Sequence, residues 1–346
     1  MPRRKRSRSP GQAVVPCGRD GGAPDRCAGS VSSLDVTAAR RERLRHELRD
    51  DGVWLPSDDA VSELVLAELD YARHPHAHEG VAPRYGAIVS PETAPLDTTG
   101  PFSVLDAGDT SLEVVRRLAD GRASFVVRAL GRPDRLLCFD RSIEYESSVV
   151  HLAVTTSAAV VQRLDRGWVR LTTPAGVGTW DGIHWANKRL GVRIAELVAP
   201  ALAGADPAVL AGVVEFAVHW LGAGRIGATL VWCVDGDAHT LDHLGFGAAV
   251  TIPTIGLTNR GHYPALLSAL SQYDRAALVD QHGSVRTVAV HLRTSEQSRH
   301  DIASFRGTRH TSALRFSSDV PNAAVFVVSS NGPLSVFWQG QRLDTG

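Results

Sequence analysis

The strongest constraint on the fold is the alternation of helical and extended segments in the C-terminal two-fifths of the chain. Asp206 followed by Pro207 is typical of a helix start, because the carboxylate caps first-turn N–H groups and proline is tolerated at the first helical position. Gly222 is typical of the end of that helix. We therefore predict a mixed α/β (α+β) fold for residues 206–346, in which a mixed β-sheet is flanked by helices.

Apolar periodicity and turn residues define the remaining elements of this half. The predicted strands are Ile226–Val234, Arg275–Asp280 and Ser284–Leu292, together with a hairpin of Ala323–Ser329 and Leu334–Trp338. The predicted helices are Tyr263–Gln272 and one that runs from Thr308 onward. Asn331 and Gly332 predict a type I′ turn in that hairpin. Residues 222–227 match the Gly-x-Gly-x-x-Gly dinucleotide fingerprint, but they follow a helix and precede a strand, the reverse of what pyrophosphate binding requires.

The chain of 346 residues is 43% hydrophobic, enough for two domains. We predict a disordered tail at 1–30, a domain of N-terminal helices and a small β-rich part at 31–180, a connecting helix at 181–205, and the mixed domain at 206–346. The helices of the first domain are expected at 33–50 and 56–73, with Ser57 as a cap. Its strands are expected at Phe125–Leu130, Leu136–Asp140, Val149–Thr155, Ala158–Arg163 and Trp168–Thr172, with a turn at Asp165–Gly167 and the connecting helix at Ile183–Leu202.

Charge and hydropathy exclude several classes of partner. Lys and Arg number 37 and so do Asp and Glu, so no bulk positive field favours nucleic acid, and the basic cluster at 3–8 is predicted to be a solvated tail rather than a nucleic-acid contact. No apolar run is long enough for a membrane span, so we expect no membrane partner and a cytoplasmic location. Cys138 and Cys233 are predicted as buried thiols, and the histidines at 74–79 as a loop rather than a metal site.

Gly307-Thr308-Arg309-His310 stands just before a short amphipathic helix. Backbone N–H groups at a helix start point outward, and the helix dipole favours an anion there. Arg309 can grip two phosphate oxygens, and Thr308 can offer a hydroxyl while capping the helix. The motif alone is common on solvated helix starts, so its flanking residues matter.

Those flanks resemble the diadenylate cyclase (DAC) domain family from about Asp206 to Gly340. In that family an Asp-Gly-Ala motif precedes a Gly-Thr-Arg-His-Arg motif by roughly thirty residues, and both face one ATP. Here Asp274-Arg275-Ala276 occupies the first position and Gly307–Thr311 the second, and 224–231 is similar to the family's opening segment. Three positions depart from the family: Arg275 replaces a glycine, Thr311 replaces an arginine, and Ser329–Gly332 replaces an acidic turn.

The resemblance implies an ATP-binding enzyme that makes cyclic di-AMP from two ATP. It assigns Asp274 as the catalytic and metal-holding carboxylate for Mg²⁺ or Mn²⁺, and it implies a homodimer or higher homo-oligomer whose sites meet face to face. The residues implied to bind nucleotide and phosphate are Arg275, Ala276, Gly307, Thr308, Arg309, His310, Thr311, Ser329 and Ser330. The β-rich half, placed before such a domain, is expected to be a sensor or regulator.

Three interpretations stay open at this point. The first is an active diadenylate cyclase with an N-terminal regulatory domain. The second is a catalytically degenerate domain that binds ATP or cyclic di-AMP as a sensor, as the three departures would allow. The third is a structural or unrelated binding protein.

Overall fold

The computed structural model describes residues 33–77, 79–91, 102–143, 145–235, 245–246, 249–304, 307–330 and 333–343. The predicted disordered tail at 1–30 and the Asn331-Gly332 turn therefore lie outside the described residues. Residues 1–39 form one unit and residues 40–346 a second one. Helix α1 spans Ser33–Asp50, as predicted. In the described part of the chain, no helix has the length and apolar character needed to cross a bilayer.

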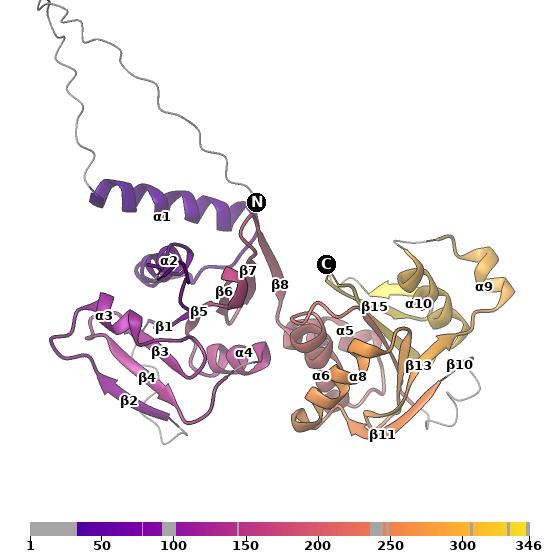
Figure 1. Ribbon diagram of the computed structural model, residues 1–346. Helices are drawn as coiled ribbons and strands as arrows, with labels where there is room; N and C mark the ends of the chain where they lie inside the picture. The colour runs from indigo at the N-terminus through magenta and orange to yellow at the C-terminus, as the bar shows by residue number, and fades with distance from the viewer. Residues whose placement is uncertain are drawn as a thin grey trace, which may run out of the picture. The chain divides into compact units, whose positions relative to one another are not determined.

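The first sheet has eight strands in the order β2-β4-β3-β1-β5-β6-β7-β8, with β1 and β3 parallel and the other neighbours antiparallel (Figure 1). Its strands are β1 (Tyr85–Ser90), β2 (Phe102–Asp106), β3 (Ser124–Ala129), β4 (Arg135–Phe139), β5 (Ala159–Arg163), β6 (Val169–Thr173), β7 (Gly176–Trp180) and β8 (Trp185–Arg189). In the described part of the chain, α2 (Asp59–Arg73), α3 (Leu112–Arg117) and α4 (Glu146–Thr155) accompany it, and Leu44 and Leu48 of α1 pack in the same cluster as α2.

Strand β1 is buried on both faces, which explains why its sequence does not alternate between apolar and polar residues. Ala87 and Val89 pack in the same cluster as α2, whereas Ile88 packs in the cluster that contains Val149 of α4. Successive side chains of a strand point to opposite faces, so α2 and α4 cover opposite faces of this sheet.

Three predictions for this half are wrong. Val149–Thr155 was predicted as a strand because it is rich in β-branched residues, but it lies in helix α4, where Glu146, Val149 and Ala153 are buried at helical spacing. The connecting helix predicted from Ile183 begins at Gly191, as α5 (Gly191–Val198), because the preceding residues form β8.

The cap predicted at Ser57 is likewise wrong. Asp58 caps α2, and its carboxylate accepts hydrogen bonds from the N–H groups of Ala60 and Val61. The predicted strands that correspond to β3, β4, β5 and β6 are all present. The turn expected at Asp165–Gly167 joins β5 to β6.

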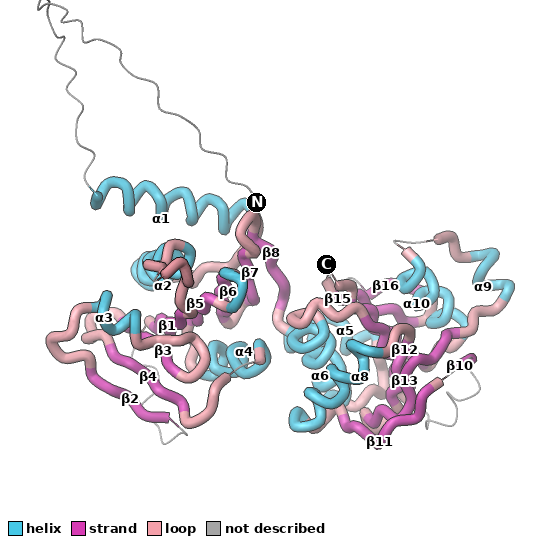
Figure 2. Tube along the Cα trace, in the orientation of Figure 1, coloured by secondary structure: helices cyan, strands magenta, loops and turns pink. Residues whose placement is uncertain are grey.

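The second sheet has the order β10-β13-β12-β9-β14-β15-β16, and β11 also pairs with β13. Figure 2 labels β10 to β13, β15 and β16 among these strands. Its strands are β9 (Ala228–Cys233), β10 (Gly245–Phe246), β11 (Val250–Gly256), β12 (Ala276–Val279), β13 (Ser284–Leu292), β14 (Ala323–Val328), β15 (Leu334–Trp338) and β16 (Gln341–Leu343). The helices around it are α6 (Pro207–Phe216), the π-helical turn η3 (Ala217–Leu221), the 3-10 turn η4 (Arg260–His262), α8 (Tyr263–Gln272), α9 (Glu296–Asp301) and α10 (Thr308–Asp319).

Strand β9 lies inside this sheet and is buried along its whole length. Leu230 and Trp232 pack in the cluster that contains residues of α5, α6 and α8, while Val231 and Cys233 pack in the cluster of α10. The sheet therefore carries helices on both faces, as the mixed α/β prediction required. Asp206 caps α6, and Gly222 follows the π-helical turn, both at the predicted positions.

Candidate functional site

Four segments meet at one edge of the second sheet because of how its strands run. Strands β9 and β12 are parallel, so Gly227 and Asp274, which precede them, lie at the same edge. Strand β14 runs antiparallel to β9, with Val328 opposite Ala228, so Ser329 and Ser330 follow it at that edge too. The start of α10 completes the group, because Arg309 contacts Asp274 there.

The Asp274 carboxylate and the Arg309 guanidinium form an ion pair, with Oδ1 2.6 Å from Nη2. The hydrogen bond from Arg309 and the backbone N–H of Arg275 hold the pKa of Asp274 below its ordinary value. The Asp274 side chain is 76% exposed and that of Arg309 is 40% exposed. An exposed pair of this kind contributes only about 0–1 kcal/mol, so either partner can turn to a ligand at low cost.

Gly227 permits this arrangement, and the sequence analysis did not single it out. A Cβ at Gly227 would lie 2.2 Å from Nη1 of Arg309 and 3.5 Å from the backbone nitrogen of Ser330. A side chain at this position would displace the Arg309 guanidinium. The available signal in the sequence was a glycine directly before a buried strand, which often marks a close approach of another group.

Arg275 has a backbone conformation that glycine normally supplies. Its φ is +80°, in the left-handed region that non-glycine residues rarely adopt. Its side chain is exposed. The turn therefore keeps the glycine conformation although the residue carries a long cationic side chain.

Helix α10 begins with an unusual cap. Gly307 is the N-cap, with φ of +109° and no side chain, so the prediction that Thr308 caps the helix is wrong. The first backbone bond runs from the Thr311 N–H to the Gly307 carbonyl. The N–H groups of Thr308 and Arg309 therefore precede the helical ladder, the position from which anions are bound.

The other predicted site residues differ in what their side chains can reach. Ala276 is buried in the sheet core, so only its backbone is near the edge. Thr311 donates its hydroxyl to the Gly307 carbonyl at 2.9 Å, and His310 packs edge-on against Phe337. Ser329 is half-buried and Ser330 is exposed.

Two family models match the chain. Residues 42–189 match "Probable sensor domain DACNK", and residues 215–342 match "DAC: DisA bacterial checkpoint controller nucleotide-binding". The C-terminal part of this chain belongs to the DAC domain family. The Asp274–Arg309 edge lies within this DAC domain. The match also agrees with the resemblance expected from the two motifs.

Two solved structures are similar to the chain. DacA from Staphylococcus aureus, in the form of a double mutant, is 18% identical over 44% of this chain and 85% of its own, with a TM-score of 0.26. A hypothetical membrane spanning protein from Bacillus cereus is 20% identical over 43% of this chain and 74% of its own, with a TM-score of 0.28. No curated protein shows a significant match.

Among the described residues at this sheet edge, Asp274 is the candidate carboxylate for a divalent cation. Among the described residues, no group of three or more His, Cys, Asp and Glu side chains is placed to hold a metal ion. Mg²⁺ is commonly held by one or two carboxylates together with substrate phosphates rather than by a complete protein cage. Asp274, exposed and ionised, is suited to hold such a cation together with substrate phosphates.

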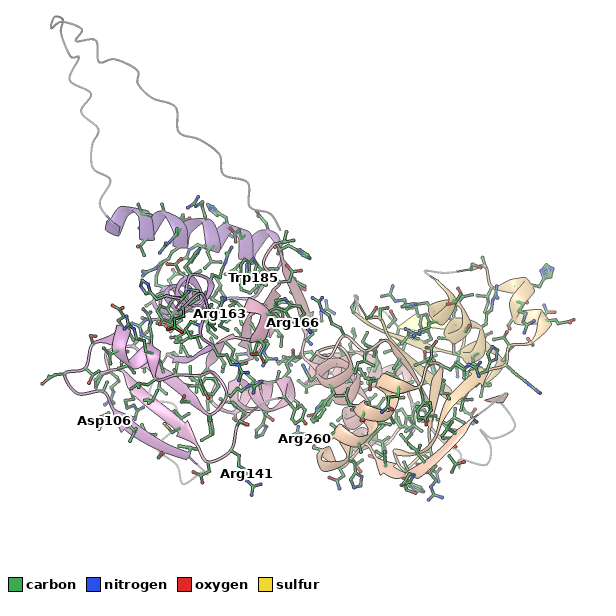
Figure 3. All side chains as sticks on the ribbon, in the orientation of Figure 1. Asp106, Arg141, Arg163, Arg166, Trp185 and Arg260 are labelled. Atoms are coloured by element: carbon green, nitrogen blue, oxygen red, sulfur yellow. The ribbon has the colours of Figure 1, made fainter. Side chains whose placement is uncertain are left out.

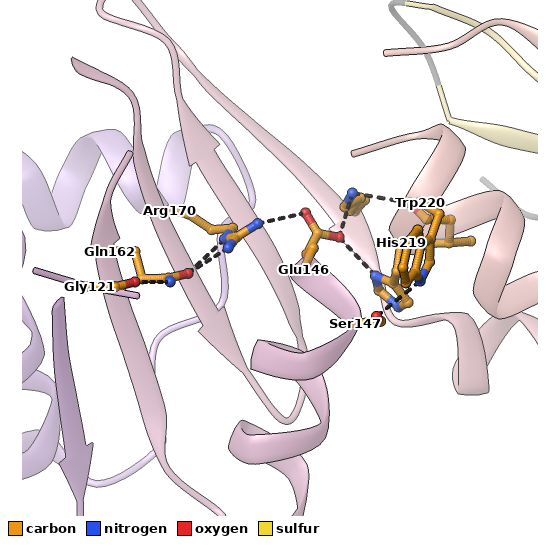
Figure 4. Close-up of polar contacts among 9 residues, drawn as sticks. Gly121, Glu146, Ser147, Gln162, Arg170, His219 and Trp220 are labelled. Atoms are coloured by element: carbon orange, nitrogen blue, oxygen red, sulfur yellow. Dashed lines mark hydrogen bonds and ion pairs between the residues drawn. The ribbon is translucent and has the colours of Figure 1, made fainter. Parts of the chain in front are cut away.

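A buried charged cluster lies outside this edge and was missed by the sequence analysis (Figure 4). Oε1 of Glu146 is 2.7 Å from Nζ of Lys188 and 2.8 Å from Nδ1 of His219. Oε2 of Glu146 lies 3.5 Å from Nη1 of Arg170. Burial alone would raise the pKa of Glu146, but Lys188, His219 and Arg170 together hold it well below its ordinary range.

The hydrogen bonds of His219 fix its tautomer. Nε2 accepts a hydrogen bond from the Gly191 N–H at 2.9 Å, so Nδ1 carries the proton and donates to Glu146. The next residue, Trp220, donates from Nε1 to the hydroxyl of Ser147 at 3.0 Å, and its ring stacks on Tyr145. Helix α4 is thereby joined by side-chain bonds to the π-helical turn that precedes β9.

Proposed function

We propose that the protein is a diadenylate cyclase that condenses two ATP molecules into cyclic di-AMP and two pyrophosphates. The observation that supports this most is the ion pair between Asp274 and Arg309 at the start of α10, within the segment that matches a nucleotide-binding family model. A carboxylate and a guanidinium beside outward-facing N–H groups suit a triphosphate and a reacting hydroxyl.

The reaction makes three demands on the site. Each ribose 3′-hydroxyl loses its proton and forms a bond to the α-phosphorus of the other ATP, while the bond from that phosphorus to pyrophosphate breaks. The charge on the α-phosphate must be offset, and the two nucleotides must be held in line. Positioning of this kind can supply about 7–11 kcal/mol of the barrier.

Arg309 and the start of α10 would hold the phosphates. Because the Asp274–Arg309 pair is exposed, phosphate oxygens can replace the carboxylate on the guanidinium at little cost. The N–H groups of Thr308 and Arg309 add donors, with Ser329 and Ser330 close by at the same edge. Gly227 leaves the room in which Arg309 lies.

Asp274 would act next to the reacting hydroxyl. Its lowered pKa keeps it ionised at neutral pH, which suits it to orient the hydroxyl or to hold Mg²⁺ or Mn²⁺ together with the phosphates. A divalent cation bound there would offset phosphate charge and favour ionisation of the hydroxyl. In this proposal Asp274 positions the attacking hydroxyl next to the phosphates.

One such edge holds one ATP, so two protomers would meet with their sites opposed. The segment at 42–189 would regulate that meeting or the geometry of each site. The partners in this proposal are ATP and a second copy of the chain.

A catalytically degenerate nucleotide sensor is the second candidate. It is favoured by the absence of a carboxylate cluster among the described residues and by Arg275 in place of a glycine. The glycine-like φ of Arg275 and its exposed side chain favour the cyclase, because the backbone turn is preserved.

The deciding experiment is incubation of the purified protein with ATP and either Mg²⁺ or Mn²⁺, followed by separation of the nucleotides. Cyclic di-AMP in amounts that scale with enzyme supports the cyclase. Tight ATP binding measured by calorimetry without product supports the sensor. If the protein neither binds ATP nor forms product, both candidate functions are refuted.

A further inference from the structure

A cavity of about 580 Å³ lies beside helix α4 and includes neither Asp274 nor Arg309. Its walls come from the end of β4, the residues that follow it, one side of α4 and Arg260 of η4. Sites for small molecules typically enclose about 300–1,000 Å³ and combine apolar walls with a few convergent polar groups. The size of this cavity is that of a small-molecule site.

The walls provide both kinds of group. Phe139, Ile143 and Leu152 contribute apolar surface. Ser148 and His151, on the same helix as Leu152, contribute polar atoms. A ligand that satisfies both needs an apolar body and at least one hydrogen-bonding group.

The lining contains two arginines and one acidic residue. Arg141 and Arg260 are both labelled in Figure 3, and Asp140 is the acidic residue. Nε of Arg260 lies 2.8 Å from Oε1 of Glu215 and forms an ion pair with it. Arg141 is exposed and lies in the segment between β4 and α4. Guanidinium groups bind carboxylates, sulfonates and phosphates through paired N–H donors.

We propose that this cavity binds a small organic anion with an apolar body, and that its occupancy is transmitted to the turn before β9 through Ser147. The binding itself is independent of the proposed cyclase activity. Its effect on the nucleotide edge rests on that proposed function.

Ser147 is the link because it belongs to both structures. It lines the cavity, and its hydroxyl accepts the hydrogen bond from Trp220 of the π-helical turn. That turn leads through Gly227 into β9, and Gly227 is the residue against which Arg309 lies. A ligand that fixes α4 therefore also restrains the segment that sets the position of Arg309.

Two fluorescent probes of the same aromatic skeleton test the binding. Anilinonaphthalene sulfonate carries an anionic group, and N-phenylnaphthylamine lacks it. We expect the full-length protein to bind the sulfonate dye at one saturable site. Arg141→Ala should lower the affinity for the sulfonate dye about tenfold and change the affinity for the neutral dye less than twofold. The reason is that a charge-assisted bond is lost for the sulfonate dye only.

Matched variants separate this cavity from other apolar surface. Leu152→Trp and Ser148→Phe, made separately, fill the cavity and should abolish saturable binding of both dyes. Arg286→Ala, at an exposed arginine of β13, should leave both affinities unchanged. Arg141 is exposed, so its variant keeps the fold and decides the outcome even where a filling variant unfolds. Equal effects of Arg141→Ala and Arg286→Ala would overturn the proposal.

Hydrogen exchange tests the transmission. Saturation with the sulfonate dye should slow amide exchange at least twofold in the peptide that covers 217–227 of the wild-type protein. In Ser147→Ala, which removes the acceptor of the Trp220 bond, the same dye should bind without that slowing. Unchanged exchange in the wild-type protein would refute the link. A protein that makes no cyclic di-AMP would still give both results.

Discussion

The guanidinium of Arg309 occupies the space that a Cβ on Gly227 would need, with 2.2 Å between that Cβ position and Nη1. Gly227 directly precedes β9, and Arg309 lies in the first turn of α10. This close contact fixes the Arg309 guanidinium at the edge of the sheet. A residue without a side chain, directly before the strand, thereby sets the position of the guanidinium.

Gly227→Ala should therefore weaken ATP binding without unfolding the protein. The added methyl group meets the far end of a flexible side chain, which can move away, so the thermal midpoint should change little. ATP affinity measured by calorimetry should fall about tenfold. Gly256→Ala in β11 is a matched control, because its Cβ would make only ordinary contacts. Unchanged ATP affinity in Gly227→Ala would show that Arg309 need not lie at that position.

Arg275→Gly should stabilise the protein by about 1 kcal/mol in urea unfolding, because glycine adopts positive φ without strain. Arg275→Ala retains the strain while removing the guanidinium, so it should not gain this stability. ATP affinity of the two variants separates the backbone effect from that of the cationic side chain. Equal stability of the glycine and alanine variants would contradict a strained turn.

Asp274→Asn and Arg309→Ala should fail in different ways. Loss of the Asp274 carboxylate should abolish cyclic di-AMP formation while ATP affinity falls less than threefold. Loss of the Arg309 guanidinium should weaken ATP affinity at least tenfold, because a charge-assisted phosphate contact is removed. Calorimetry and product separation on both variants measure the contrast, and equal losses of affinity would argue against these roles.

Glu146→Gln should destabilise the fold by about 3–5 kcal/mol at neutral pH, because Lys188 and Arg170 lose a buried counter-charge. Urea unfolding of the variant and of the wild-type protein measures this difference. Glu196→Gln, at an exposed carboxylate paired with Arg193, is the control and should change stability by less than about 1 kcal/mol.

The same cluster predicts a pH dependence. The folded-state pKa of Glu146 is lowered, so its contribution is fully present above the ordinary glutamate value of 4.5 and is lost as pH falls from there through the folded-state pKa. The stability difference between the wild-type protein and Glu146→Gln should stay constant from pH 7 to about pH 5.5 and shrink in stronger acid. A difference that shrinks between pH 7 and pH 6 would contradict the lowered pKa.

Local signals in the sequence were sufficient for elements whose own residues determine them. The helix predicted at Tyr263–Gln272 and the strand at Ser284–Leu292 have the predicted bounds, since proline marks the helix start and alternation marks the strand. The strand predicted at Val149–Thr155 is helix α4, because packing of Val149 and Ala153 against the sheet overrides the strand preference of β-branched residues.

The candidate site was predictable only in part. Two short motifs indicated Asp274 and the residues from Gly307 onward, and the structure brings Asp274 and Arg309 into contact. Gly227 could not be predicted as their neighbour, since its role depends on a close approach between segments far apart in the sequence. The Glu146 cluster was missed for the same reason, because Lys188 and His219 reach it from other parts of the chain.

The parallel pairing of β9 with β12 has a consequence for how the protein matures. The groups at this sheet edge meet only after strands separated by long stretches of chain have found their register. A partly folded chain therefore has no cradle for a triphosphate. ATP should bind only the folded domain. Nucleotide in the cell would therefore stabilise folded molecules against unfolding without helping a nascent chain to fold.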